Sequence, residues 1–426
     1  MQGFETKCVQ SGYKPKNGEP RVMPIVQSTT FLYETAEEMG ELFDLKREGF
    51  FYTRLGNPTN DCLEQKMAIL DGGTAAVVTA SGMSATMMAV LTLAGAGDNI
   101  VSMSTIYGGT YNLFKNTFKK LDIECRFFTP TTSEADIEAL IDDNTRVIFC
   151  ETIANPAITI ADFEMLSRIA KKYGIVLMSD NTLATPAICR PKEHGVNVVV
   201  YSSSKYLDGH ATCVGGVVVD CGNFEYSGNK RYPLFNEPDE SYHGLVFARD
   251  CGNVCFAVRL RVINMRDMGA QMAPMNAWLT NLGTETLSLR MERHSSNALA
   301  LAAALEKHPN VEWVNYAGLP TNANYPLVQK YFDKNQATGM IAFGIKGGRD
   351  AAMLFQKQLK LFAIVTHIAD TRSCVLHPAS TTHRQLSDAD LEACGISTNL
   401  IRLSVGIESV EDIIADIINA LDNSGK

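Results

Sequence analysis

The sequence predicts an α/β protein, with a large domain on a mostly parallel sheet and a smaller α/β domain at the C-terminal end. Short apolar runs alternate with amphipathic stretches between residues 75 and 202, which is the pattern of strands that are each followed by a helix. The apolar runs lack a polar face, as is typical of parallel strands covered on both sides. The 426 residues also exceed one ordinary core, because single domains hold roughly 100–200 residues.

An extended arm is expected over residues 1–59. This part is rich in Gly, Pro, Asn and Thr, and its periodicity is weak. An arm of this length needs a surface to pack on, and a neighbouring subunit is the expected one. A helix follows over residues 60–71, with Asn60 as its N-cap and Gly72 as its end.

The large domain is expected over residues 60–265. Its apolar runs predict strands at 75–80, 99–104, 124–129, 146–151, 175–180 and 196–202. The amphipathic stretches between them predict helices, among them 81–94, 110–121, 162–173 and one that opens with the capping box Ser133–Asp136.

The smaller domain is expected over residues 266–426, because the regular alternation stops near residue 265. A long helix is predicted over 284–308, a strand over 400–407 and a last helix over 409–421. The sequence contains neither an internal repeat nor a low-complexity segment.

The composition argues against several classes of function. The formal net charge is −9, so neither nucleic acid nor an anionic membrane is an expected partner. The apolar stretches are too short and too interrupted to span a bilayer. The first twenty residues lack the apolar segment of a secretory signal, which favours a cytoplasmic location.

The eleven cysteines are scattered without tight spacing. An odd number in this arrangement argues against a disulfide framework, so most of them are expected to be reduced. Cys251 and Cys255 form one CxxxC pair with no second pair nearby, which favours plain burial over zinc. No metal site is expected.

A candidate phosphate site lies where a strand passes directly into a helix at Ser81, Gly82 and Met83. The free backbone N–H groups and the dipole at a helix start attract anions. A tight strand–helix turn without a ligand explains the same residues. The glycine-rich motifs of dinucleotide-binding and P-loop proteins are absent from the sequence.

Three charged residues stand at positions where a charge is unusual. Asp180 ends an apolar strand and can pair with a cationic ring nitrogen, or simply cap a turn. Lys205 follows a strand through the hydroxyls of Ser202–Ser204, so it is either a desolvated nucleophile or an exposed loop lysine. Arg402 interrupts an apolar strand and suits a carboxylate ligand, or an ion pair on an edge strand.

These features form a meaningful set. A phosphate cradle, a strand-end acid, a Schiff-base lysine and a carboxylate-binding arginine are what a pyridoxal phosphate enzyme needs to act on an amino acid. The alternative from another class is a binding or scaffold protein that keeps the same fold without the cofactor.

The sequence resembles the Cys/Met-metabolism family of pyridoxal phosphate enzymes over nearly its whole length. The stretches that carry the resemblance are YTRLGNPTN, ASGMSA, IYGGTYNLF, SDNTLATP, SSSKYLDGHATCVGGVVVD, TLSLRMERH, HPASTTH and IRLSVGIE. The resemblance implies fold type I of the pyridoxal phosphate enzymes, which is the aspartate-aminotransferase fold.

The resemblance also implies roles toward the cofactor. Lys205 forms the Schiff base and moves protons, Asp180 keeps the pyridine nitrogen protonated, and Tyr107 stacks on the ring. The phosphate is bound at two strand ends and the helix start, by Gly82, Met83, Ser202 and Ser204.

Other implied roles concern the substrate and a second subunit. Tyr52 and Arg54 reach the phosphate from a neighbouring subunit, which implies an obligate dimer and an expected homotetramer. Arg402 binds the α-carboxylate of an amino-acid substrate. The remaining substrate-binding candidates are Tyr52, Asn155 and His367, and Asn155 also lies near the cofactor oxygen.

Within the family, the sequence resembles the branch that replaces the acetate of O-acetylhomoserine by sulfide or methanethiol. Gly109 stands where methionine γ-lyases typically have Cys, residues 237–245 belong to a long segment after Lys205, and the chain is longer than the lyases usually are. The alternative is a methionine or cystathionine γ-lyase, which yields 2-oxobutanoate, ammonia and a thiol.

Two residues depart from the family: His367 replaces a small polar residue such as Asn or Ser, and Ala154 stands where Gly is commoner.

Overall fold

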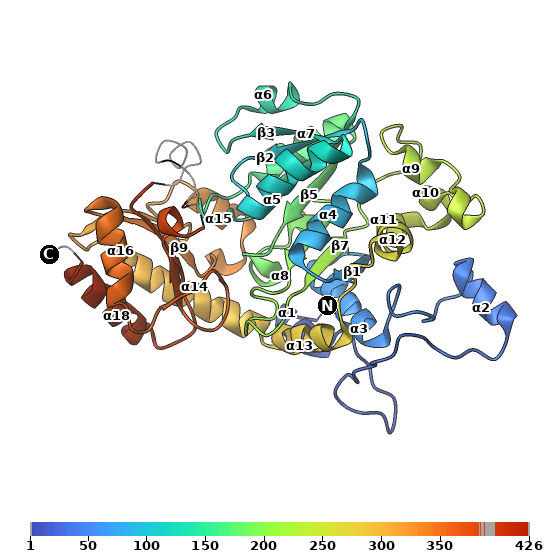
Figure 1. Ribbon diagram of the computed structural model, residues 1–426, viewed down its shortest axis with the longest axis horizontal. Coiled ribbons are helices and arrows are strands. Elements are labelled where there is room, and N and C mark those ends of the chain that lie inside the picture. Colours follow the sequence, from blue (N-terminus) through green and yellow to red (C-terminus); the bar gives the residue numbers. More distant parts are fainter. Residues whose placement is uncertain (1, 383, 385–386, 388–396, 425–426) are drawn as a thin grey trace.

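The protein is built around two sheets, one in a large N-terminal part and one in a smaller C-terminal part (Figure 1). A computed structural model describes residues 2–382, 384, 387 and 397–424. Helices lie on both faces of the larger sheet, as expected for a sheet whose strands are apolar on both sides.

The larger sheet has seven strands in the order β1-β7-β6-β5-β4-β2-β3. All neighbours within β6-β5-β4-β2-β3 pair parallel, whereas β7 runs antiparallel to both β1 and β6. The six predicted strands and the mostly parallel sheet are confirmed. The bounds are β1 Ala75–Thr79, β2 Asn99–Met103, β3 Glu124–Phe128, β4 Thr145–Glu151, β5 Val176–Asp180, β6 Val198–Ser202 and β7 Gly216–Asp220.

The smaller sheet has five strands in the order β10-β11-β12-β9-β8. Its strands pack against α14 (Leu287–Leu305), α16 (Gly348–Gln358) and α18 (Val410–Asp422), around a second apolar core. The predicted long helix, the strand near residue 400 and the last helix are thereby confirmed. The strand bounds are β8 Val311–Asn315, β9 Met340–Ile345, β10 Ala363–Ile364, β11 Cys374–Leu376 and β12 Leu400–Ser404.

Two helix predictions need correction. Helix α3 (Pro58–Asp71) begins earlier than expected, and its N-cap is Asn57 rather than Asn60. Asn57 accepts from the Thr59 N–H, and Pro58 fills the first helical position. The Asn60 side chain instead donates to the carbonyl of Met272.

The second correction concerns the helix expected over residues 110–121, which is three short pieces. The α-helix α5 (Gly108–Asn112) passes into a π-helical turn over 113–117 and then a 3₁₀ turn over 118–121. By contrast, α4 (Gly82–Leu93) and α7 (Phe163–Tyr173) agree with the prediction, and Ser133 caps α6 (Glu134–Glu138) as expected.

The remaining helices connect the two parts or lie at their edges. Their bounds are α1 Phe4–Gln10, α2 Ala36–Phe43, α8 Thr185–Ile188, α9 Pro233–Asn236, α10 Phe247–Asp250, α11 Cys255–Arg259, α12 Arg266–Met268, α13 Pro274–Glu285 and α15 Tyr325–Tyr331. None of the helices within the described ranges combines the length and the apolar character needed to cross a bilayer.

The N-terminal arm contains two helices and a long extended portion. Helix α1 packs against α3, α13 and α14 of its own chain and buries Cys8. The portion around α2 extends away from the rest of the molecule (Figure 1). It exposes large apolar side chains, among them Leu32, which is 97% exposed, and Phe43. The division into 1–59, 60–265 and 266–426 stays a prediction.

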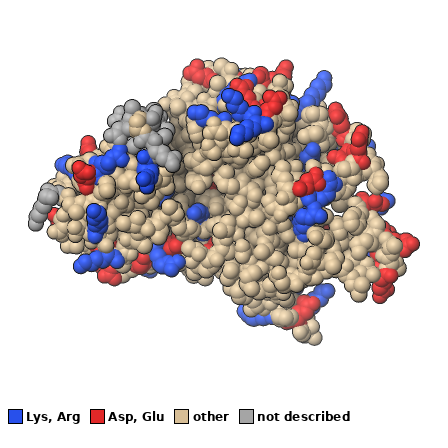
Figure 2. Space-filling view, viewed as in Figure 1, with Lys and Arg blue, Asp and Glu red and all other residues tan. Residues whose placement is uncertain are grey.

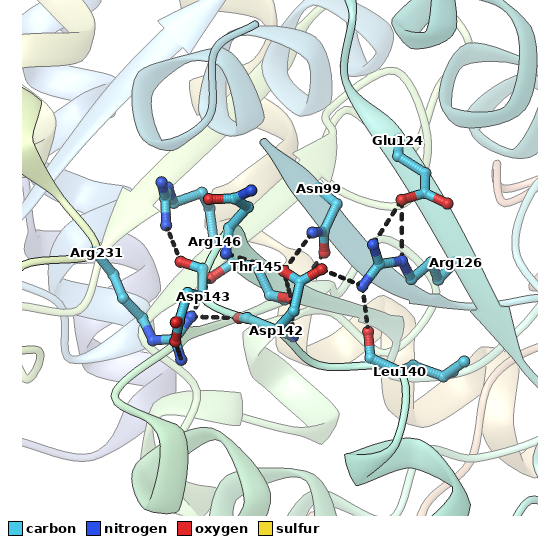
Figure 3. Close-up of polar contacts among 10 residues, drawn as sticks. Asn99, Glu124, Arg126, Leu140, Asp142, Asp143, Thr145, Arg146 and Arg231 are labelled. Atoms are coloured by element: carbon cyan, nitrogen blue, oxygen red, sulfur yellow. Dashed lines mark hydrogen bonds and ion pairs between the residues drawn. The ribbon is translucent and has the colours of Figure 1, made fainter. Parts of the chain in front are cut away.

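A polar network at the amino ends of the strands ties β2, β3 and β4 together (Figure 3). Asp142 accepts hydrogen bonds from Asn99 and Arg126. Burial raises the pKa of Asp142, but the bonds from Asn99 and Arg126 outweigh it and lower the value to about 2. This network lies at the end of the sheet opposite the candidate site. Elsewhere, acidic and basic side chains are interspersed over the face drawn in Figure 2.

Candidate active site

A cavity of about 500 Å³ lies at the carboxyl ends of the strands of the larger sheet, where ligands of open α/β sheets usually bind. Residues 366–368 and Arg402, from the smaller part, face this end of the sheet. Ten of the twelve predicted site residues line the cavity: Gly82, Met83, Tyr107, Asn155, Asp180, Ser202, Ser204, Lys205, His367 and Arg402.

The start of α4 forms one end of the cavity. Ser81 caps the helix and accepts from the Ser84 N–H, so the N–H groups of Gly82 and Met83 belong to the first turn, which has no intrahelical acceptor. A Cβ at Gly82 would lie 2.6 Å from the Cβ of Ser202. Gly82 therefore lets the helix start approach the end of β6, and leaves a cradle that suits an anion.

The two serines of this cradle differ in their contacts. The backbone N–H of Ser202 donates to the Thr182 hydroxyl at 2.9 Å. The hydroxyl of Ser204 accepts from the Gly215 N–H at 3.0 Å, so it is already engaged with the backbone. The side chain of Ser202 is the freer of the two to meet an anion.

Asp180 lies at the end of β5, and one of its carboxylate oxygens accepts from the Thr182 N–H at 2.9 Å. Asp180 therefore does cap a turn, as one of the two interpretations expected. Burial raises the pKa of Asp180, and no cationic side chain in the described ranges forms an ion pair with it. A buried carboxylate of this kind lacks a positive partner, which a protonated ring nitrogen would supply.

Lys205 is partly buried in the loop between β6 and β7. Burial lowers the pKa of its ammonium group, and the nearby guanidinium of Arg402 lowers it further. Both effects favour the neutral amine, which is the form that attacks a carbonyl carbon. The interpretation as an exposed loop lysine is therefore wrong.

Arg402 is 9% exposed and lies in β12, which is an interior strand between β11 and β9. Its Nη1 donates to the Asn155 Oδ1 at 3.3 Å, and no carboxylate in the described residues forms an ion pair with it. The edge-strand ion pair is therefore ruled out. A buried guanidinium without an anion has the geometry and the charge to bind a carboxylate that enters the cavity.

Tyr107 stands at the start of α5 and is 51% exposed. A Cβ at residue 109 would lie 2.5 Å from the Tyr107 Cε1, so Gly109 is what leaves room for this ring orientation. The Tyr107 N–H donates to the Glu151 Oε1 at 2.7 Å. The ring thus borders the cavity, while its backbone is held by a buried carboxyl group.

Sequence reasoning missed Glu151 and Thr182, which both line the cavity. Glu151 ends β4 beside Asp180 on β5, and burial and then the charge of Asp180 raise its pKa. The sequence contained a signal for both residues, since each stands at or just after the end of a predicted strand.

Ala154, which stands where the family more often has Gly, is fully buried, and its N–H donates to the Thr159 carbonyl. Its φ is not positive, so alanine fits at this position.

Tyr52 and Arg54 are absent from the cavity lining of their own chain. The Arg54 guanidinium lies 5.2 Å from the centre of the Tyr52 ring and donates to the carbonyl of Arg266. Tyr52 is 40% exposed. Tyr52 is therefore exposed and Arg54 is partly buried, and neither side chain lines the cavity of its own chain.

The described residues fit pyridoxal phosphate in three respects. The helix start with Gly82 suits the phosphate, Asp180 suits the ring nitrogen, and Lys205 suits the aldehyde carbon. No cluster of three or more His, Cys, Asp or Glu side chains in the described part of the chain is placed to hold a metal ion.

Comparison with known proteins identifies the class. Fold and site define a pyridoxal phosphate-dependent enzyme of fold type I. Residues 5–422 match the family described as Cys/Met metabolism PLP-dependent enzyme. The chain belongs to this family.

Individual relatives match over nearly their full lengths. An O-acetyl-L-homoserine sulfhydrylase from Leptospira meyeri is 42% identical, covering 98% of this chain and 96% of the relative. A homocysteine synthase from Schizosaccharomyces pombe is 43% identical, covering 98% of both. The crystal structure of a Campylobacter jejuni protein assigned as an O-acetylhomoserine (thiol)-lyase superimposes with a TM-score of 0.95 at 40% identity, covering 99% of this chain and all of that one. That structure carries N'-pyridoxyl-lysine-5'-monophosphate at its position 205.

Proposed function

We propose that the protein replaces the acetate of O-acetyl-L-homoserine by sulfide or methanethiol, giving L-homocysteine or L-methionine. The observation that carries this proposal is the full-length match to relatives named O-acetyl-L-homoserine sulfhydrylase and homocysteine synthase. The cavity supports this proposal, because its lining contains both Arg402 and Lys205. Arg402 is buried and suits a carboxylate, and the lowered pKa of Lys205 favours its neutral amine.

The contacts support a set of proposed cofactor-binding roles. Lys205 holds the cofactor covalently, as the lysine of the Campylobacter jejuni structure does. Asp180 stabilises a protonated ring nitrogen, and Tyr107 stacks on the ring. The phosphate is bound by the N–H groups and hydroxyls of the cradle: Gly82, Met83, Ser202 and Ser204. When bound, pyridoxal phosphate supplies a ring that accepts the negative charge left at Cα.

The substrate is oriented by the other side of the cavity. Arg402 binds the α-carboxylate, and Asn155, which accepts from Arg402, fixes the plane of the guanidinium. His367 and a partner's Tyr52 complete the substrate pocket. Tyr107 or Lys205 removes the proton at Cα, and Lys205 Nζ then moves protons while acetate leaves from Cγ. Exclusion of water favours attack by sulfide over the lyase outcome.

The substrate assignment is tested by one pair of assays at equal enzyme concentration. With O-acetyl-L-homoserine and sulfide, we expect homocysteine as the main product, measured by chromatography. With L-methionine alone, we expect slower release of 2-oxobutanoate. A faster reaction with methionine would replace our assignment by that of a γ-lyase.

The active sites are proposed to be shared between subunits of a homotetramer built from two dimers. The support is that Tyr52 and Arg54 lie outside the cavity of their own chain and that the arm exposes apolar side chains. The proposed location is the cytoplasm, since the ten cysteines in the described ranges are all free thiols, as in a reducing compartment.

Sharing predicts complementation between two inactive variants. The variants Lys205→Ala and Arg54→Ala are each expected to lose most activity. When the two are mixed, unfolded and refolded together, half of the dimers would be hybrids, and each hybrid would have one intact site of two. The mixture should therefore recover about a quarter of the wild-type activity. The measurement is the rate of homocysteine formation before and after subunit exchange. If Arg54 served its own chain, no hybrid would carry an intact site and the mixture would stay inactive.

A further inference from the structure

The side chain of Glu151 holds the backbone of a residue that is distant in the sequence. Its Oε1 accepts from the Tyr107 N–H at 2.7 Å, and the Asn155 N–H also stabilises the carboxylate form. Glu151 is 5% exposed and lines the cavity together with both of these residues. One carboxyl group therefore connects the residue that is proposed to stack on the cofactor ring with the residue that accepts from Arg402.

Tyr107 has few other restraints on its position. It directly precedes α5, a helix of five residues that has no side-chain cap. Tyr107 is 51% exposed, so packing holds its ring only weakly. The hydrogen bond to the buried Glu151 is therefore the contact that fixes where the backbone of Tyr107, and with it the ring, borders the cavity.

Glu151 also stands beside the carboxyl group that is proposed to face the ring nitrogen. It is the register partner of Asp180 in the parallel pair β4–β5, and both side chains line the cavity. Within the described residues, neither of the two forms an ion pair with a basic side chain. Burial is the largest effect that raises the pKa of each group, and the charge of Asp180 raises the pKa of Glu151 further.

A count of charges decides which of the two carboxyl groups keeps its proton. One carboxylate pairs with the protonated ring nitrogen of the bound cofactor, which carries a single positive charge. Asp180 is better prepared for this role, because it accepts from the Thr182 N–H at 2.9 Å and the Thr182 hydroxyl also lowers its pKa. A second carboxylate at Glu151 would be a buried charge without a partner. Two neighbouring carboxyl groups in different environments commonly keep different protonation states.

We propose that Glu151 is a positioning residue that acts as an undissociated carboxylic acid: it anchors the Tyr107 backbone and leaves Asp180 as the only negative charge of the pair. This inference rests on the proposed cofactor-binding roles of Asp180 and Tyr107. A second carboxylate beside the ring would oppose the negative charge that the ring has to accept from Cα. The neutral acid supplies the anchor without this repulsion.

Two substitutions of similar size separate the anchor from the charge. Glu151→Gln keeps an oxygen that can accept from the Tyr107 N–H, whereas Glu151→Leu fills the space without an acceptor. We expect Glu151→Leu to lower kcat for homocysteine formation by about tenfold or more, because a buried N–H loses its partner. We expect Glu151→Gln to recover most of this loss. A glutamine variant as slow as the leucine variant would show that the negative charge is required, and would overturn the inference.

A double-mutant cycle tests whether Glu151 acts through Tyr107. In a Tyr107→Ala background, Glu151→Leu should lower kcat by no more than about threefold, because the ring that it positions is gone. Losses that simply add would show that Glu151 acts through another residue. Glu292→Gln, on the exposed face of α14, is the control and should keep the rate and the melting temperature of wild type.

Infrared spectroscopy detects the proton on Glu151 without turnover. The spectra of the cofactor-loaded wild type and of Glu151→Gln are compared at neutral pH, so that other buried acids cancel in the difference. We expect a C=O stretching band of a protonated carboxyl group that shifts in D₂O and is missing from Glu151→Gln. The control Glu292→Gln should retain this band. A difference spectrum without it would mean that Glu151 is ionised and that the inference is wrong.

The inference and the proposed function can fail separately. A cofactor-loaded protein that shows the band yet makes no homocysteine keeps the neutral Glu151 and loses the substrate assignment. A protein that makes homocysteine without the band keeps the function and loses the inference.

Discussion

Replacing Lys205 by alanine is expected to abolish the visible absorbance of the cofactor-loaded protein and to lower the replacement rate on the order of 10³-fold or more. Both effects follow from the loss of one nitrogen, since Lys205 Nζ is proposed to hold the cofactor and to move the protons. The measurements are an absorbance spectrum after gel filtration and steady-state kinetics with O-acetylhomoserine and sulfide.

Lys119→Ala is the matched control, because Lys119 is exposed on the turn after α5, well outside the cavity lining. It should keep the spectrum and the rate of wild type. A Lys205→Ala protein that retains both the spectrum and the rate would show that another residue holds the cofactor and moves the protons.

Replacing Arg402 by alanine is expected to lower kcat/KM for O-acetylhomoserine while the cofactor spectrum is preserved. Removing one partner of a buried charged contact costs about 2–5 kcal/mol, which corresponds to roughly 30- to 4,000-fold in kcat/KM. Arg402→Lys should recover part of this loss, because it keeps the charge but loses the planar fork that matches a carboxylate.

Stability provides the control for Arg402. Because no carboxylate of the described residues pairs with this buried guanidinium, its removal should leave the melting temperature unchanged or raise it. Arg293→Ala, on the exposed face of α14, should change neither kcat/KM nor stability. An Arg402→Ala protein with wild-type kcat/KM would place the carboxylate elsewhere.

The sequence predicted the central strands well, because β4, β5 and β6 are short apolar runs that end at a polar residue, and burial on both faces makes such runs easy to recognise. It predicted the helix ends less well. Asn57 and Asn60 are both good caps, and only the position of Pro58 in the folded helix decides between them. The three-piece helix after Tyr107 and the antiparallel β7 depend on neighbours that are distant in sequence.

The candidate site was predictable where a residue breaks a local pattern, as Arg402 does within an apolar strand. Contacts between distant segments carry no such mark. The 3.2 Å approach of His367 to Lys205 joins the two parts of the molecule, and Glu151 acts on Tyr107 through a backbone N–H. Neither contact can be recognised from the spacing of residues or from the composition, so both became visible only in the structure.

The reversed direction of β7 determines how freely Lys205 can move. A parallel return from β6 would need a long crossover, usually through a helix, whereas β7 pairs directly with β6, and Ser202 lies opposite Gly216. The loop that carries Lys205 is therefore anchored at both ends within the same sheet, and Asp208 braces it through the N–H groups of His210 and Thr212. The loop that positions the Lys205 Nζ therefore loses its conformational entropy when the protein folds, and this loss is not repeated in each catalytic cycle.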